Sequence, residues 1–334
     1  MPDAIVTRNL TKTFGKKVAV RDLSLAIPTG SLCGVIGPNG AGKTTTIRMI
    51  MSIIFPDSGE LSVLGKASAV ESKDRIGYLP EERGLYKKMR VAAFLAYIAK
   101  LKGVDSAAAG KKAAHWLARV GLGDVARKKC EELSKGMQQK VQFIASVIHE
   151  PDLLILDEVF SGLDPVNRRL MRELIDEQHR AGRTILFSTH AMYEAEQLCD
   201  RILMIHDGRK VLDSTLAQIR ADFDPRTIVA EPDGDPAAAA ELLRRLPIIR
   251  EVESVAGDNG RPGSQLTIRL VDSAQPPAAL AAITAAAPMR RVELTRVNLE
   301  DVFIDLVQTE AGATISRDAL RAADSPALEP AHAS

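Results

Sequence analysis

A glycine-rich segment near the N-terminus has the residue types needed to bind a polyphosphate. Residues 37–44 read GPNGAGKT, which matches the pattern G-x-x-x-x-G-K-[ST]. Glycines let backbone N–H groups turn toward an anion, and a helix starting here adds its positive end. Lys43 supplies a mobile charge for the β- and γ-phosphates, and the Thr44 hydroxyl is a ligand for Mg²⁺. We therefore expect ATP to be held by Gly37, Pro38, Asn39, Gly40, Ala41, Gly42, Lys43, Thr44 and Thr45.

Two carboxylates follow a second apolar segment. Residues 153–158 read LLILDE, so four apolar residues precede Asp157 and Glu158. A carboxylate at the carboxyl end of a central strand lies where the active sites of such sheets form. We expect Asp157 to hold Mg²⁺, directly or through water, and Glu158 to polarise the attacking water as a general base. The alternative is that the two acids merely end a strand, which the upstream phosphate-binding segment disfavours.

The elements that must position these residues alternate between strands and helices. A short apolar strand at 31–36 leads into the glycine-rich loop, and a helix follows from Thr44. The segment from about 88 to 149 has long helical periodicities. Strands return near 153–156 and 184–188, with a helix between them, which predicts a largely parallel sheet with helices on its faces. Asp207-Gly208 between two apolar runs predicts a β-hairpin.

The pattern changes after about residue 222. Strands and helices in the order β-α-β-β-α-β indicate a small α+β split-βαβ sandwich. A helix whose apolar residues share one face is expected to close this sandwich; they are Leu299, Val302, Phe303, Leu306 and Val307. We predict domains at 1–221 and 222–308, followed by a disordered tail at 309–334. The second domain shows no catalytic residues, so we expect dimer support or packing, with a regulatory ligand site as the alternative.

Composition excludes several classes of protein. The chain has 334 residues, with 44 Lys and Arg against 43 Asp and Glu, and lacks the basic excess of a nucleic-acid-binding protein. Three widely spaced cysteines without a CxxC pair predict neither a zinc site nor a disulfide framework. No apolar stretch reaches the about 20 residues that a membrane span needs, and the N-terminus does not read as a signal peptide. We expect no nucleic-acid partner and no crossing of a bilayer by this chain.

Residues 133–139 read LSKGMQQ, and here the sequence resembles the ATP-binding cassette (ABC) family, whose signature is an LSGGQ-like segment. Lys135 replaces the first glycine and Met137 the usual glutamine. Ser134 and Gly136 keep a hydroxyl and bare backbone N–H groups for a γ-phosphate. The resemblance implies a P-loop NTPase cassette with a mixed sheet and a helical subdomain at about 88–149. It also implies that these two residues contact ATP held by a second copy, in a head-to-tail dimer.

Further motifs match the family in its order. The resemblance implies that Phe14 stacks on adenine, although alone it is as readily a core aromatic. Asp164 in the segment SGLD matches the D-loop that couples the two sites, and His190 matches the switch histidine that contacts the γ-phosphate. Glu81 stands where the family usually has its Q-loop glutamine, and Glu82 takes that place if the register shifts by one. A carboxylate here still ligates Mg²⁺ but adds negative charge near the γ-phosphate.

Two segments resemble one group within the family. Residues 78–86 (YLPEERGLY) and 298–303 (NLEDVF) look like those of sodium-extruding exporter ATPases, and drug-resistance exporter ATPases look similar in the cassette. The resemblance implies an ATPase subunit on the cytoplasmic face of the membrane, which drives a separate integral membrane permease contacted by residues 83–97. Two alternatives remain: a soluble ABC ATPase acting on ribosomes or nucleic acid, and a nucleotide-binding regulator without catalysis. A P-loop kinase would not explain the signature segment, Glu158 and His190 together.

Overall fold

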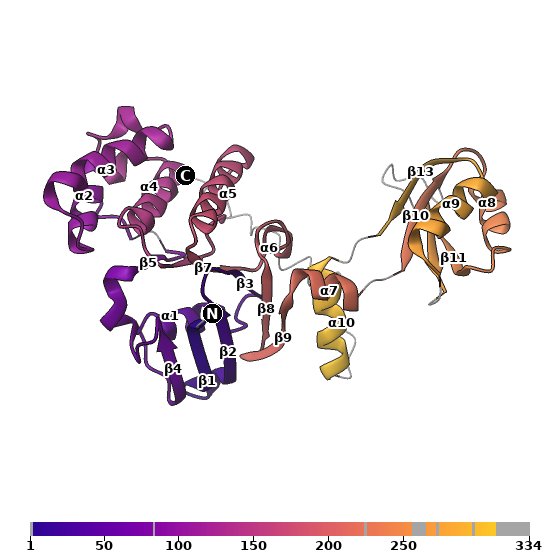
Figure 1. Ribbon diagram of the computed structural model, residues 1–334, viewed down its shortest axis with the longest axis horizontal. Coiled ribbons are helices and arrows are strands. Elements are labelled where there is room, and N and C mark those ends of the chain that lie inside the picture. The colour runs from indigo at the N-terminus through magenta and orange to yellow at the C-terminus, as the bar shows by residue number, and fades with distance from the viewer. Residues whose placement is uncertain are drawn as a thin grey trace, which may run out of the picture. The chain divides into compact units, whose positions relative to one another are not determined.

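The computed structural model describes residues 3–82, 84–223, 226–255, 265–271, 274–295 and 298–311. The chain divides into two compact units (Figure 1). The first unit contains the described residues up to Leu216 together with the helix that begins at Leu299, and the second spans Ala217–Asn298. The tail predicted at 309–334 lies, from residue 312 onward, outside the described residues.

A six-stranded sheet with the order β5-β6-β7-β3-β8-β9 forms the centre of the first unit. Its strands are β3 (Leu32–Ile36), β5 (Ile76–Leu79), β6 (Leu153–Asp157), β7 (Thr184–Thr189), β8 (Arg201–His206) and β9 (Arg209–Thr215). All neighbours are parallel except β8 and β9, which form an antiparallel hairpin. Every residue of β3, β6 and β7 is buried, as in sheets covered on both faces. The predicted parallel sheet and the hairpin at Asp207-Gly208 are confirmed.

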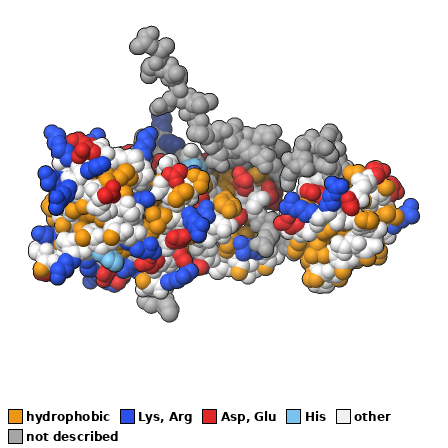
Figure 2. All heavy atoms as spheres, turned by 90° about the horizontal axis from the view of Figure 1, so that it is seen from above, with side chains coloured by type: hydrophobic (Ala, Val, Ile, Leu, Met, Phe, Trp, Pro, Cys, Tyr) orange, Lys and Arg blue, Asp and Glu red, His pale blue; other side chains and the backbone are white. Residues whose placement is uncertain are grey.

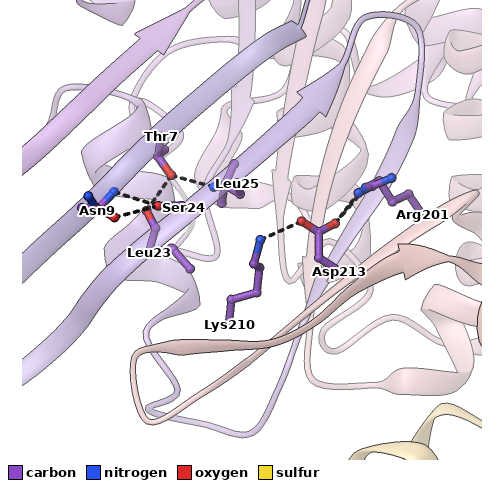
Figure 3. Close-up of polar contacts among 8 residues, drawn as sticks. All are labelled: Thr7, Asn9, Leu23, Ser24, Leu25, Arg201, Lys210 and Asp213. Carbon is purple, nitrogen blue, oxygen red and sulfur yellow. Dashed lines mark hydrogen bonds and ion pairs between the residues drawn. The ribbon is translucent and has the colours of Figure 1, made fainter.

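A three-stranded antiparallel sheet, β2-β1-β4, forms a second layer of this unit. Its strands are β1 (Asp3–Phe14), β2 (Lys17–Pro28) and β4 (Ser58–Val63). Where the β1–β2 register shifts, the buried Thr7 hydroxyl donates to Leu23 O at 2.8 Å and accepts from Leu25 N at 3.2 Å (Figure 3). Thr7 thereby satisfies backbone groups that the irregular ladder leaves unpaired. Arg201 on β8 contacts Asp213 across the β8–β9 hairpin, and Lys210 contacts the same carboxylate from within β9 (Figure 3).

Most helices of the first unit gather on one side of the six-stranded sheet, and α1 lies between that sheet and the three-stranded one (Figure 1). The bounds are α1 (Lys43–Ile50), α2 (Val91–Leu101), α3 (Ser106–Arg119), α4 (Lys135–Val147), α5 (Pro165–Arg180) and α6 (Met192–Leu198), with short 3₁₀ turns at Ala69–Arg75, Gly123–Val125 and Cys130–Glu132. Asp105 caps α3 by accepting from Ala107 N and Ala108 N. Helices α2, α3 and α4 pack on one another and form the helical part expected between about residues 88 and 149.

The helix α10 (Leu299–Ala311) groups with the first unit, whereas the sequence pattern assigned it to the small domain. Leu299 N donates to the Glu196 carboxylate on α6, and the Phe303 ring lies edge-on to the His206 ring with centroids 5.6 Å apart. Phe303 is buried. The apolar face of this helix was predicted correctly, but the surface it covers was not, because periodicity identifies a buried face and not its partner.

The second unit has one antiparallel sheet with the order β11-β12-β10-β13. Its elements are β10 (Thr227–Pro232), α8 (Pro236–Leu243), β11 (Ile249–Val255), β12 (Gln265–Leu270), α9 (Pro276–Ala286) and β13 (Met289–Leu294), preceded by α7 (Leu216–Asp222) at the boundary. Leu243 and Ile283 of the helices share a core with Ile228, Leu266 and Ile268 of the strands. The element order β-α-β-β-α-β is confirmed.

Charged side chains of both signs are interspersed on the face drawn in Figure 2, in keeping with the net charge of +1. Among the helices in the described part of the chain, none is long and apolar enough to cross a membrane.

Candidate functional site

A pocket of about 320 Å³ opens over the phosphate-binding loop of the first unit. It is lined by Phe14, Lys17, Ala19, Asn39, Gly40, Gly42, Lys43, Thr44, Thr45, Glu81 and Glu158. The loop runs from the end of β3 to the start of α1, so the helix directs its positive end at the pocket. Gly42 has φ 107°, and a Cβ there would lie 2.5 Å from Ala19 O. Only glycine fits this close approach.

Lys43 is buried inside the loop, with 6% of its surface exposed. Its Nζ donates to Gly37 O at 2.7 Å and to Pro38 O at 3.1 Å, and lies 3.9 Å from Glu158 Oε1. Burial lowers the pKa of Lys43, while the carboxylates of Glu158, Asp157 and Glu81 act in the opposite direction. The acceptors of this partly desolvated ammonium group are two neutral backbone carbonyls. A polyphosphate would offer it stronger, charge-assisted hydrogen bonds.

The ends of β6 and β7 bring Glu158 and His190 together. Glu158 Oε1 lies 3.0 Å from His190 Nδ1, and Glu158 Oε2 accepts from Thr189 Oγ1 at 3.5 Å. The Glu158 backbone has φ 50°, which is rare outside glycine, and its N–H donates to Ser188 O at 3.0 Å. Such strained backbone concentrates at functional sites. It directs the Glu158 carboxylate toward the loop lysine.

Asp157 is a buried carboxylate whose two oxygens accept no hydrogen bond of good geometry within the described residues. Burial raises its pKa to about 6, and the Ser188 and Thr44 hydroxyls only partly oppose that. An unpartnered carboxylate beside a threonine hydroxyl fits Mg²⁺, which prefers oxygen ligands. No group of three or more His, Cys, Asp or Glu side chains forms a metal site in the described ranges. Phosphate and water would supply most ligands of such an ion.

Asp157→Asn should stabilise the nucleotide-free fold at pH 7.5 by about 1–3 kcal/mol. The folded pKa is raised from 3.8 to about 6, so the favourable contribution of Asp157 is complete below pH 3.8 and is lost as pH rises through 6. The gain from removing the charge should therefore shrink toward pH 4.5. Urea unfolding of wild type and variant at the two pH values measures it.

Asp207→Asn is the matched control, because the Asp207 side chain is 89% exposed. That variant should show no pH-dependent gain. If Asp157→Asn instead lowers the free energy of unfolding at pH 7.5, burial does not penalise the charged form of Asp157.

Ser134, Gly136 and Asp164 do not line this pocket. Ser134 caps α4 by accepting from Met137 N at 3.3 Å, and Asp164 caps α5 by accepting from Asn167 N at 2.9 Å. A Cβ on Gly136 would lie 3.3 Å from Asn167 Nδ2, so the signature segment and the start of α5 are neighbours. These residues therefore lie at the starts of α4 and α5, outside the lining of the pocket.

Two further predicted residues, Phe14 and Glu81, line the pocket. Phe14 is 51% exposed at the end of β1 and lines the pocket, which removes the alternative that it is a core aromatic. Glu81 lines the pocket and Glu82 does not. Of the two residues that could stand at the Q-loop position, the pocket therefore favours Glu81. Lys17 and Ala19 also line the pocket, and no sequence motif predicted them. Their only signal was their place directly after the turn that follows Phe14.

Glu81→Gln should strengthen the binding of metal-free ATP by about 3- to 10-fold. The Glu81 carboxylate faces the phosphate-binding pocket, and one charge across a few ångströms of partly hydrated space is worth about 1 kcal/mol. Titration with ATP in excess chelator measures the change. Glu82→Gln, which alters the adjacent exposed carboxylate, should leave the affinity unchanged; equal effects of both variants would refute a local role for Glu81.

The fold and the site define a P-loop nucleotide-hydrolysing protein. A family model for the ABC transporter matches residues 20–161, and one for the ATP-binding protein DrrA1-3-like C-terminal domain matches residues 215–307. The protein is 40% identical over 299 residues to the uncharacterized ABC transporter ATP-binding protein YhaQ of Bacillus subtilis (strain 168), which covers 90% of this chain and 97% of that protein.

A second relative and a solved structure indicate the same family. The Nod factor export ATP-binding protein I of Burkholderia orbicola (strain AU 1054) is 33% identical over 306 residues, which covers 91% of this chain and 96% of that one. A solved structure described as the ATP-binding subunit of an ABC transporter matches with a TM-score of 0.61 at 30% identity, over 66% of this chain and 93% of that chain. The chain therefore belongs to the family of ABC transporter ATP-binding proteins. It binds ATP and is an ATPase.

Proposed function

We propose that this chain is the ATP-hydrolysing subunit of an exporter and drives a separate integral membrane permease. The observation that supports this most directly is the position of Glu158, whose carboxylate lies 3.0 Å from His190 and 3.9 Å from Lys43 beside a phosphate-binding loop. This arrangement suits hydrolysis of a bound triphosphate rather than nucleotide binding alone.

In this proposal Glu158 accepts a proton from the water that attacks the γ-phosphate. His190 contacts the γ-phosphate and holds the Glu158 carboxylate in place. Lys43 exchanges its contacts with Gly37 O and Pro38 O for the β- and γ-phosphates. Mg²⁺ bound by Thr44, Asp157 and Glu81 would neutralise phosphate charge. Phe14 supplies an exposed ring for adenine, where stacking on an aromatic is worth about 1–3 kcal/mol.

The working unit is proposed to be a head-to-tail pair of cassettes. Ser134, Gly136 and Asp164 are absent from the lining of their own pocket and present capped helix starts on a separate surface. In a pair, the N-terminal end of α4 in one copy would face the γ-phosphate held by the other. Closure on ATP and reopening after hydrolysis would then provide two states for a permease to follow.

The proposed permease contact is an exposed aromatic surface at the start of the helical part. Tyr86 is 50% exposed and Tyr97 is 41% exposed, and their ring centroids lie 5.9 Å apart. Leu101 on the same helix as Tyr97 is also exposed. Clustered exposed apolar side chains commonly mark protein interfaces. Through this contact the chain would lie on the cytoplasmic face of the membrane.

Export is proposed as the direction of transport, because a relative that matches nearly the whole chain is named for Nod factor export. Sodium ions and drug-like compounds remain the proposed substrate classes. We also propose that the predicted domain of residues 222–308, whose last helix groups with the first unit, supports the cassette pair. The domain boundaries at 1–221 and 222–308 remain predictions.

Fractionation of native cells tests the proposed location and partner class. The chain should sediment with membranes, resist high-salt washing that removes ribosomes, and be released by alkaline carbonate as a peripheral protein. Sedimentation with ribosomes that is abolished by nuclease treatment would overturn the transport proposal in favour of a soluble ABC ATPase.

A further inference from the structure

Two buried glutamines lie three residues apart on α4, so their side chains share one face of the helix. Gln139 is 4% exposed and Gln142 is 6% exposed. Each side-chain amide reaches out of the helix to a distant segment. Gln139 Nε2 donates to Val159 O and Gln142 Nε2 donates to Glu82 O, both at 3.1 Å. One helix face thus holds the backbone of two separate loops.

The two carbonyls belong to the residues that directly follow the carboxylates of the pocket. Val159 follows Glu158, and Glu82 follows Glu81, and both glutamates line the pocket. Helix α4 also packs beside β5, the strand that leads into Glu81 (Figure 1). A displacement of a carbonyl moves the preceding peptide and its side chain, because the backbone has only two soft torsions per residue. Each glutamine therefore holds the backbone of the residue next to one of the two carboxylates.

The hydrogen-bonding of Gln142 argues against a purely stabilising role. Its Oε1 is buried and accepts no hydrogen bond in the described part of the chain, which costs free energy in the folded state. An apolar side chain of similar length would avoid that cost. Such a side chain could not, however, donate a hydrogen bond to Glu82 O.

We infer that Gln139 and Gln142 are positioning residues, which set the placement of Glu158 and Glu81 from the helix that begins at Ser134. The inference rests on the proposed function, in which Glu158 is the general base and Ser134 meets the nucleotide of a second copy. When Ser134 engages that nucleotide, any shift of α4 passes through both hydrogen bonds to the two carboxylates of its own pocket. The signature helix of one copy thus adjusts catalysis in the same copy.

Gln139→Met and Gln142→Met test the inference, because methionine keeps the length and removes the donor. Each variant should lower kcat for ATP by about 5- to 30-fold while KM changes less than about twofold, since neither residue touches the pocket that holds ATP. Gln178→Met is the matched control. Gln178 on α5 is 2% exposed and also has an unpartnered Oε1, and its kcat should stay at the wild-type value.

A double-mutant cycle separates positioning from general destabilisation. In a Glu81→Gln background, Gln142→Met should lower kcat by less than about twofold, because the two residues act through one segment. Equal losses of kcat in both backgrounds would overturn the inference for Gln142. Wild-type kcat in both methionine variants would overturn it for the pair. The proposed function is tested separately by ATP hydrolysis. It fails if the wild-type chain does not hydrolyse ATP, or if Glu158→Gln does not abolish that hydrolysis.

Discussion

Replacing Glu158 with glutamine should lower ATP turnover by about 100-fold or more, while ATP affinity stays within a few-fold of wild type. A general base contributes about 10²- to 10⁴-fold, and glutamine keeps the shape of the side chain but accepts no proton. Binding should persist because Lys43, although it lies 3.9 Å from Glu158 Oε1, is also held in the loop by its bonds to Gly37 O and Pro38 O. Phosphate release and nucleotide titration on the purified chain measure the two quantities.

The same variant should accumulate as a pair of cassettes in Mg²⁺ and ATP, because in the proposed cycle the pair reopens only after hydrolysis. Sedimentation of Glu158→Gln with and without ATP would show this as a doubling of mass. Glu82→Gln, which alters an exposed carboxylate outside the pocket, should behave as wild type in both assays. Turnover within about threefold of wild type in Glu158→Gln would rule out Glu158 as the base.

Replacing Lys43 with alanine should weaken ATP binding by about 100-fold, which corresponds to about 3 kcal/mol. The Lys43 side chain is 6% exposed and carries the positive charge of the loop at residues 37–44, whereas Lys17 lines the pocket from β2. Charge-assisted hydrogen bonds to phosphate are strong in such a desolvated place. Alanine also removes the donors that hold Gly37 O and Pro38 O, so the loop loses its internal support as well.

Titration of ATP into Lys43→Ala and Lys16→Met compares a buried loop lysine with an exposed one. Lys16 does not line the pocket, and its replacement should leave affinity unchanged. Similar affinities for both variants would mean that the phosphates bind elsewhere. A fall in the unfolding midpoint of Lys43→Ala, measured without nucleotide, would separate a folding defect from a binding defect.

Local sequence patterns predicted the parts of this protein that depend on local chemistry. The glycine spacing of residues 37–44 specified the loop between β3 and α1, because its positive φ angles and close contacts admit little else. Asp207-Gly208 specified a hairpin for the same reason. The β-α-β-β-α-β order of the second unit followed from alternating apolar patterns.

Features that depend on distant parts of the chain were not predicted. The packing of α10 on α6 needs the position of Glu196, which no local pattern contains. Lys17 reaches the pocket because the start of β2 lies beside the loop, where a Cβ on Gly42 would meet Ala19 O. The sequence showed Gln139 only as the last residue of the signature segment at 133–139. Its hydrogen bond to Val159 O was not predicted, because it depends on where β6 lies relative to α4. Long-range hydrogen bonds of this kind leave no periodicity in the sequence.

The central claim is that this chain energises a membrane permease, and affinity capture from detergent-solubilised native membranes tests it most directly. Tagged Glu158→Gln, loaded with ATP, should copurify a polytopic membrane protein. The additional exchange Tyr97→Arg, at an exposed site on α2, should abolish that capture and leave ATP binding intact. Recovery of ribosomal, nucleic-acid-associated or other soluble proteins alone would contradict the claim, although the ATPase chemistry would stand.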